Sequence, residues 1–234
     1  MFVNRLWIAC LLAVACTDGT TKTEGKFQDD LRRLDGIIRE YNDIPQMQKT
    51  AENKGNIDIV FWKDKEQLNK YYVKHKGDFV SIDASLKHIS EKTDNILFDD
   101  ALFARGILYS LWAQVDRNAD TVQSAIAILR DFVNLSPSMH IEESTKKAVQ
   151  NSYWNAYRDF STPSLSYEDN VRILFYNNIG YLLTILKQYD AAAKEYETIV
   201  NKYPTSKFAT HAQTQIQILR DIAEGKNTSD SSPP

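Results

Sequence analysis

The chain has 234 residues, of which 43% are hydrophobic and 25% are charged, so it can bury a substantial core. Only 8 glycines and 6 prolines occur, which favours long helices over a turn-rich β fold. The formal net charge of -3 provides no basic excess, and we therefore exclude nucleic acid as a partner.

The N-terminus has the layout of an export signal. Arg5 precedes an apolar run over 6–15, which is about half of the roughly 20 residues that a membrane-spanning helix needs. The residues AVAC at 13–16 resemble the lipobox of bacterial lipoproteins, and they also fit an ordinary signal-peptidase site. Both patterns cut before Cys16 and remove Cys10 with the leader. The single cysteine left in the mature chain favours lipidation of Cys16.

Composition divides the chain into five segments. Residues 1–15 are the predicted signal peptide, and the polar residues 16–26 predict a flexible tether. The tail over 224–234 has a similar polar composition, and we expect it to be disordered. Between them we expect an N-terminal helical region over 27–95 and helical repeats over 96–223.

The N-terminal region predicts helices separated by an extended segment. Apolar residues recur at spacings of three and four over 27–41, which is typical of a helix. The segment 56–64 alternates briefly, and since no partner strand is evident we expect extended chain packed on helices. Asp64 and Gln67 match a capping box that starts the next helix, and a further helix is expected from near Ser81.

From Asp99 onward, the sequence predicts only helices and short connections. Asp120 with Gln123, and Ser166 with Asp169, match capping boxes at two of the helix starts. The expected ranges are 99–115, 120–137, 141–159, 166–186, 191–203 and 206–223. The predicted fold class is therefore all-α.

A repeated pattern of large and small residues lies within this helical part. Its clear copy consists of Tyr176, Ile179, Gly180, Leu183, Ala192, Tyr196 and Pro204. Gly180 and Ala192 are small where two antiparallel helices are expected to press together, and Pro204 marks the turn to the next helix.

An earlier copy consists of Tyr109, Trp112, Ala113, Ala125, Leu129, Phe132 and Pro137. Pro137 precedes Pro204 by 67 positions, close to two periods of 34. The copy departs from the pattern at Asp116, so its first helix either ends early or shifts register. An alternative alignment places Gly106 and Tyr109 at the small and large positions, with a longer loop between the helices.

These spacings resemble the tetratricopeptide repeat (TPR), and residues 196–216 are similar to repeats in envelope proteins of Gram-negative bacteria. Those proteins include the lipoprotein of the outer-membrane protein assembly machine and the coordinator of the Tol-Pal system. The resemblance implies a right-handed helical solenoid whose concave face binds a partner segment, with Asn177, Tyr181 and Thr184 on that face. The family's clamp for a C-terminal carboxylate has Lys and Asn where Asn177 and Tyr181 stand, so we do not expect a carboxylate ligand.

The leading interpretation is a scaffold without a cofactor or enzymatic activity, anchored by lipid on the periplasmic side of the outer membrane. Its partners would be another envelope protein, bound in the groove, and the membrane. A first alternative is a ligand-binding accessory of a transport system, with an apolar cavity lined by Trp154 and Tyr157. A second alternative is an enzyme, for which Asp58, Asp64, His75 and Asp78 would have to converge in a cleft.

No catalytic or metal site is expected from motifs. The four histidines lack metal-ligand spacing, and no phosphate loop, nucleophile elbow or HExxH motif occurs. The acidic pairs, such as Asp99-Asp100, lie near expected helix starts, where negative charge is favourable.

Overall fold

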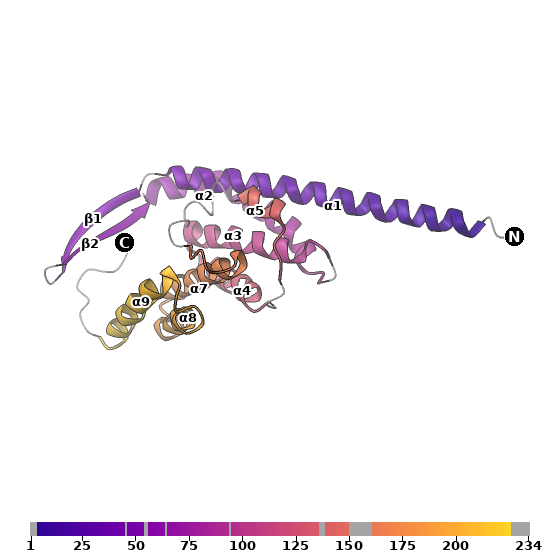
Figure 1. The fold of residues 1–234 in the computed structure, drawn as a ribbon. Coiled ribbons are helices and arrows are strands. Elements are labelled where there is room, and N and C mark those ends of the chain that lie inside the picture. The colour runs from indigo at the N-terminus through magenta and orange to yellow at the C-terminus, as the bar shows by residue number, and fades with distance from the viewer. Residues whose placement is uncertain are drawn as a thin grey trace.

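The computed structural model describes residues 4–44, 46–53, 56–63, 65–93, 95–135, 139–149 and 161–225. Figure 1 shows a long helix along one side, with the other helices stacked in succession away from it. The helices are α1 (Asn4–Asp43), α2 (Lys65–Ser90), α3 (Phe98–Asp116), α4 (Ala119–Val133), α5 (Glu143–Val149), α7 (Tyr167–Ile185), α8 (Tyr189–Lys202) and α9 (Lys207–Ala223). The all-α class is confirmed, with one hairpin of strands added to it.

That hairpin joins β1 (Gln46–Asn53) to β2 (Asn56–Lys63) as an antiparallel pair, with Gln46 opposite Lys63 and Asn53 opposite Asn56. The sequence indicated extended chain over 56–64 but no partner for it. The partner was missed because β1, QMQKTAEN, is polar and lacks the alternation that identifies a strand. The two strands pair through backbone hydrogen bonds, which do not depend on an alternating pattern of side chains.

Helices α1 and α2 form an antiparallel pair. The buried residues Leu31 and Leu34 of α1 share the core with Phe79 and Ile82 of α2. The sequence predicted a second helix from near Ser81, whereas α2 continues unbroken to Ser90. Nothing between its two halves stops it, because the exposed Gly77 costs only about 1 kcal/mol in a helix interior.

The N-terminal part of α1 extends beyond the stacked helices (Figure 1). The backbone of residues 16–26, for which the polar sequence predicts a flexible tether, is helical and continuous with the packed part of α1. No proline interrupts this segment, so the helix beginning at the core can propagate through it. The boundary between tether and helical region is therefore not marked by a change in backbone structure.

Two helix hairpins, α3 with α4 and α7 with α8, stack against one another through α4 and α7. Each turns through a basic residue in the left-handed conformation, Arg117 with φ 53° and Lys187 with φ 59°. The α3 helix ends at Asp116, one residue beyond its predicted end, and α4 begins at Ala119, so no longer loop separates the two helices.

The helix starts agree with local capping to different degrees. Ser166 accepts a hydrogen bond from the Asp169 N–H at 3.0 Å, as the capping pair predicted. The start of α4 is instead capped by Asn118, which accepts from the Asp120 N–H at 2.9 Å. Asp120 was therefore placed two residues too far along as the cap, because Asn118 is an equally good capping residue.

Aromatic and small residues hold the two hairpins together. The rings of Phe103, Phe132 and Phe175 come from α3, α4 and α7, with centroids 4.8 to 6.3 Å apart. Gly106 on α3 lies against the ring of Phe175, where a Cβ would come within 2.5 Å of a ring carbon. Close contact between α3 and α7 therefore depends on glycine at this position.

Candidate functional site

A groove of about 280 Å³ lies on the side of the hairpin stack formed by the first helix of each hairpin and by α9. Its lining residues are Gln114 of α3, Asn177, Asn178 and Tyr181 of α7, Tyr196 of α8, and His211 and Gln215 of α9. The groove therefore collects side chains that lie up to about a hundred positions apart in the sequence.

Two of the three residues expected on the concave face line this groove. Asn177 and Tyr181 do so, both partly buried. Thr184 does not: its hydroxyl donates to the Gly180 carbonyl at 2.9 Å, one turn earlier on the same helix. This back-bond, common for threonine within helices, turns the hydroxyl toward its own backbone and away from a partner.

Asn177 carries the clearest sign of an unmet interaction. Its Oδ1 atom is buried and has no hydrogen-bond partner among the residues that the structure describes. An unpaired buried acceptor costs about 1–3 kcal/mol, which a donor from a ligand or a water would offset. The neighbouring Asn178 is different, because its side chain is buried and donates to the Ser110 hydroxyl at 3.1 Å.

Among the residues that the structure describes, the groove is lined by amide, phenol and imidazole groups and by no carboxylate, ammonium or guanidinium. His211 is exposed, and its ring contacts those of Tyr196 and Phe208. Desolvation by the surrounding protein lowers the pKa of His211. At neutral pH its imidazole is therefore uncharged. Such a lining offers donors and acceptors for a polypeptide backbone, and it lacks the cation that a terminal carboxylate requires.

The residues missed from the sequence are those on α3, α8 and α9. One of them carried a signal, because Gln114 precedes Tyr181 by the same 67 positions that separate the two prolines of the repeat. His211 and Gln215 carried none, because their approach depends on how α9 packs beside α8.

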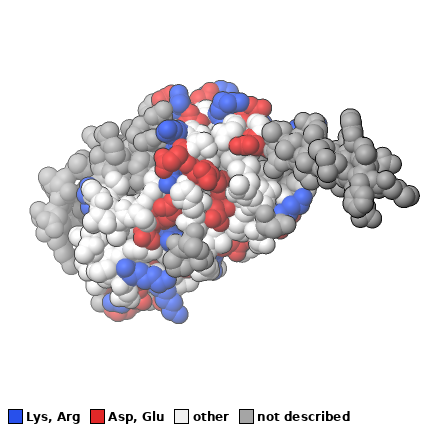
Figure 2. Space-filling model, turned by 45° about the vertical axis from the view of Figure 1, so that its right-hand side comes forward, with Lys and Arg blue, Asp and Glu red and all other residues white. Residues whose placement is uncertain are grey.

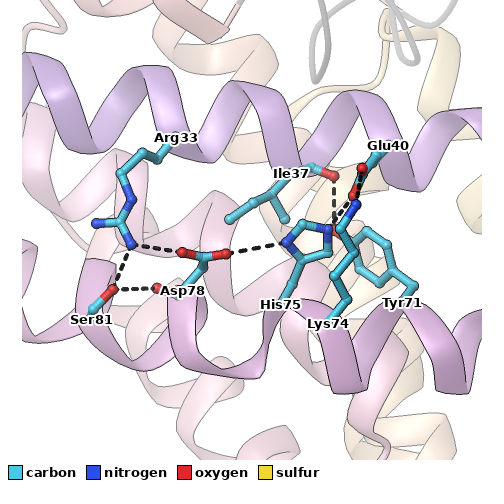
Figure 3. Close-up of polar contacts among 8 residues, drawn as sticks. All are labelled: Arg33, Ile37, Glu40, Tyr71, Lys74, His75, Asp78 and Ser81. Carbon is cyan, nitrogen blue, oxygen red and sulfur yellow. Dashed lines mark hydrogen bonds and ion pairs between the residues drawn. The ribbon is translucent and has the colours of Figure 1, made fainter.

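A second polar arrangement lies between α1 and α2, and it brings together two residues of the enzyme hypothesis (Figure 3). His75 faces the Asp78 carboxylate through Nδ1 at 3.3 Å and Glu40 through Nε2. Arg33 donates to Asp78 at 2.8 Å, and Lys74 pairs with Glu40. The chain of contacts runs across the helix pair and joins each acid of one helix to a base of the other.

These contacts set the protonation of the carboxyl groups. Hydrogen bonds from Lys74 and then His75 lower the pKa of Glu40. A hydrogen bond from Arg33 is the largest cause that lowers the pKa of Asp78. Both carboxylates are thus charged at neutral pH and form ion pairs with cations of the opposite helix. The arrangement therefore stabilises the packing of α1 against α2.

The other residues of the alternative hypotheses are not brought to this place by any described contact. Asp58 lies on β2, opposite Ala51 of β1. Asp64, Trp154 and Tyr157 lie outside the described residues. Cys16 lies on the helical backbone of α1.

Asp99 and Asp100, expected to favour the start of α3, also accept hydrogen bonds from the backbone of the segment that precedes α5. Asp99 accepts from the His140 N–H at 3.1 Å, and Asp100 accepts from the Glu142 N–H at 3.0 Å. Both acids therefore have structural partners. Within the described parts of the chain, no group of three or more His, Cys, Asp or Glu side chains is placed to hold a metal ion.

The molecular surface mixes both signs of charge. Figure 2 shows acidic side chains gathered near the middle of one face, with basic side chains around them. Among the residues that were searched for spanning segments, which are the described ones, no helix is both long and apolar enough to cross a membrane.

Comparison with known proteins finds no match. No protein-family model, curated protein or solved structure is similar to the chain.

Proposed function

We propose that the chain is a lipid-anchored scaffold of the cell envelope that binds a segment of another envelope protein in the groove on α3, α7 and α9. In this proposal the hairpins α3–α4 and α7–α8 form a TPR-like solenoid, and α9 extends it. Cys16 carries the lipid, and the scaffold faces the periplasm from the outer membrane. Binding makes and breaks no covalent bond.

One observation carries the proposal: Asn177 and Tyr181, which the repeat pattern placed on a binding face, line a groove with an unpaired acceptor at Asn177. The first helices of the two hairpins, α3 and α7, supply this lining together with Tyr196 of α8 and residues of α9. A stacked array of this kind presents a continuous surface suited to an elongated segment. The segment expected is extended and uncharged, since the lining has hydrogen-bonding groups but no ionic ones.

Affinity capture of the membrane-anchored protein, with and without the substitutions Asn177→Ala and Tyr181→Ala, tests this function. We expect an envelope protein to be captured by the unchanged chain and lost from the double variant. Lys194→Ala on the exposed part of α8 is the matched control, because it lies outside the groove. Equal capture of the partner by the double variant and the control would contradict the assignment of the groove as the binding site.

The anchor is tested separately by mass spectrometry of the mature N-terminus. An acylated Cys16 is expected as the first residue. An unmodified cysteine there would remove the anchor from the proposal and leave the groove untouched.

A further inference from the structure

A second cleft lies between α1 and α2, at the end of their contact nearest the N-terminus. Its volume is about 320 Å³, within the range of about 300–1,000 Å³ of small-molecule sites. Its polar lining consists of Lys22, Thr23, Lys26, Ser81, Ser85 and His88. The buried Ile89 forms part of the apolar lining.

The charge of this cleft differs from that of the rest of the helix pair. Further along, each acid that faces across is matched by a base, as for Arg33 with Asp78 and Lys74 with Glu40. In the cleft, two ammonium groups, an imidazole and three hydroxyls meet, and no carboxylate of the described side chains lines it. Lys92 adds a third ammonium beside His88, with its Nζ 3.4 Å from the ring Nε2.

The two lysines are not matched by acids elsewhere. No ion pair joins Lys22 or Lys26 to a side chain that the structure describes. The acid that follows Lys26 most closely on α1, Asp29, pairs with Arg32 and does not line the cleft. The cleft therefore keeps a local positive charge on a chain whose net charge is -3.

Ammonium and hydroxyl donors around a pocket of this size suit the oxygens of a phosphate group. Charged donors make stronger hydrogen bonds to phosphate than neutral donors do. The Ser85 hydroxyl is placed to donate to a remaining oxygen, whereas the Ser81 hydroxyl already donates to the Asp78 carbonyl at 3.2 Å. A phosphodiester with a small polar substituent matches the volume. A choline headgroup fits less well, because its cation would face Lys22 and Lys26.

The position of the cleft indicates where such a phosphate comes from. Lys22 follows Cys16 by six residues on the same helix, which is about 9 Å of helix length. The α1 residues of the cleft also lie between Cys16 and Phe27, the first of the described core residues on this helix. We propose that this cleft, defined by Lys22, Lys26, Ser85 and His88, binds the phosphate headgroup of an anionic phospholipid in the anchoring membrane, an inference that rests on the proposed lipidation of Cys16.

Such binding orients the scaffold. A lipid on Cys16 fixes one point of α1 at the membrane, and α1 could otherwise swing about it. A headgroup held between α1 and α2 adds a second point, on the body of the protein. Two contacts reduce the freedom of the helical stack, so the groove on α3, α7 and α9 is presented at a limited range of angles.

The test uses the full chain carrying Cys16→Ser, so that no acyl chain contributes, and measures co-sedimentation with vesicles. Two vesicle types are compared: phosphatidylcholine alone, and phosphatidylcholine mixed with phosphatidylglycerol. We expect binding to the mixed vesicles to be about tenfold tighter, since each lysine at an anionic surface contributes on the scale of a several-fold gain. The apolar residues 6–15 contribute to both vesicle types alike, and Arg5 is present in every variant, so the change in the ratio between variants reports the cleft.

The paired substitution Lys22→Gln and Lys26→Gln should abolish this preference, and Ser85→Ala should weaken it. The matched control is Lys76→Gln with Lys194→Gln, two exposed lysines outside the cleft. An equal loss in the control pair would show a diffuse surface effect and overturn the site. Circular dichroism on each variant checks that the helices remain folded.

A competition experiment with soluble ligands distinguishes a lipid headgroup from free inorganic phosphate as the source of the bound phosphate group. Displacement by soluble glycerophosphoglycerol, with weaker displacement by inorganic phosphate, supports a lipid headgroup. A chain that binds inorganic phosphate and shows no preference for phosphatidylglycerol vesicles overturns the lipid assignment. Because acylation and the groove on α3, α7 and α9 take no part in these measurements, their failure is distinguishable from failure of the scaffold function.

Discussion

Gly180 on α7 lies directly against the ring of Tyr196 on α8. A Cβ at position 180 would come within 2.7 Å of two ring carbons, closer than real Cβ contacts allow. The sequence predicted a small residue here where two antiparallel helices meet. The structure shows that the large neighbour is Tyr196, which also lines the groove.

We therefore expect Gly180→Ala to destabilise the protein by about 1–3 kcal/mol, because the added methyl group must displace a buried ring. The measurement is the free energy of unfolding in urea. Gly36→Ala is the matched control, since Gly36 lies in the exposed part of α1 with nothing within 4 Å of its Cβ position. It should stabilise by about 0.5–1 kcal/mol, as alanine does relative to glycine in a helix. Equal effects at the two sites would contradict the close contact.

A buried polar pair joins the two hairpins. Asn178, 4% exposed, donates to the hydroxyl of Ser110, 1% exposed, at 3.1 Å. Removing either partner leaves the other without this hydrogen bond in the core, so Asn178→Ala and Ser110→Ala should each cost about 1–3 kcal/mol. The double variant should cost less than the two single effects added, which a double-mutant cycle measures. Strict additivity would mean that the two side chains act independently.

The pair of α1 with α2 should weaken in acid. The pKa of Glu40 and that of Asp78 are lowered in the folded state, so below the unfolded values of about 4.3 and 3.9 the unfolded chain binds more protons. The stability that these carboxylates contribute is present above those values and is lost as the pH falls through the folded pKa.

Urea unfolding of Asp78→Asn and the unchanged chain between about pH 6 and pH 3 measures this effect. The stability difference between the two should shrink as the pH falls. Other carboxyl groups contribute to both chains alike, including Asp100, whose pKa burial raises. Lys76→Gln, an exposed residue of α2 whose ammonium is charged throughout this pH range, is the control and should show a flat difference. A flat difference for Asp78→Asn as well would remove Asp78 from the link between the helices.

Two serines at helix starts should respond differently to alanine. The hydroxyl of Ser166 caps α7 by accepting from the Asp169 N–H, so Ser166→Ala should cost about 1 kcal/mol. Ser206 occupies the same position before α9 but makes no side-chain cap hydrogen bond, and its buried hydroxyl has no partner in the described parts of the chain. Ser206→Ala should therefore be neutral or stabilising in thermal unfolding. A larger loss at Ser206 than at Ser166 would contradict the capping assignments.

Features set by neighbouring residues were predictable from the sequence. The helices α3, α7, α8 and α9 end at most one residue from the predicted positions, because caps, prolines and apolar spacing act within a turn or two of the chain. The TPR-like geometry, the lipid on Cys16 and the envelope partner stay predictions. The prediction was wrong where two nearby residues are equally good N-caps, as with Asn118 and Asp120 at the start of α4.

The sequence by itself determined the all-α class, the hairpin of α7 with α8 and the position of Asn177 and Tyr181 on one helix face, since these follow from the helical period. Only the tertiary structure decided which other side chains meet them. Gln114 and His211 reach the groove, and Lys22 and Ser85 share a cleft, through packing between separate helices. Such contacts depend on how whole helices cross, and that crossing is set by the combined burial of many side chains that no short stretch of sequence contains.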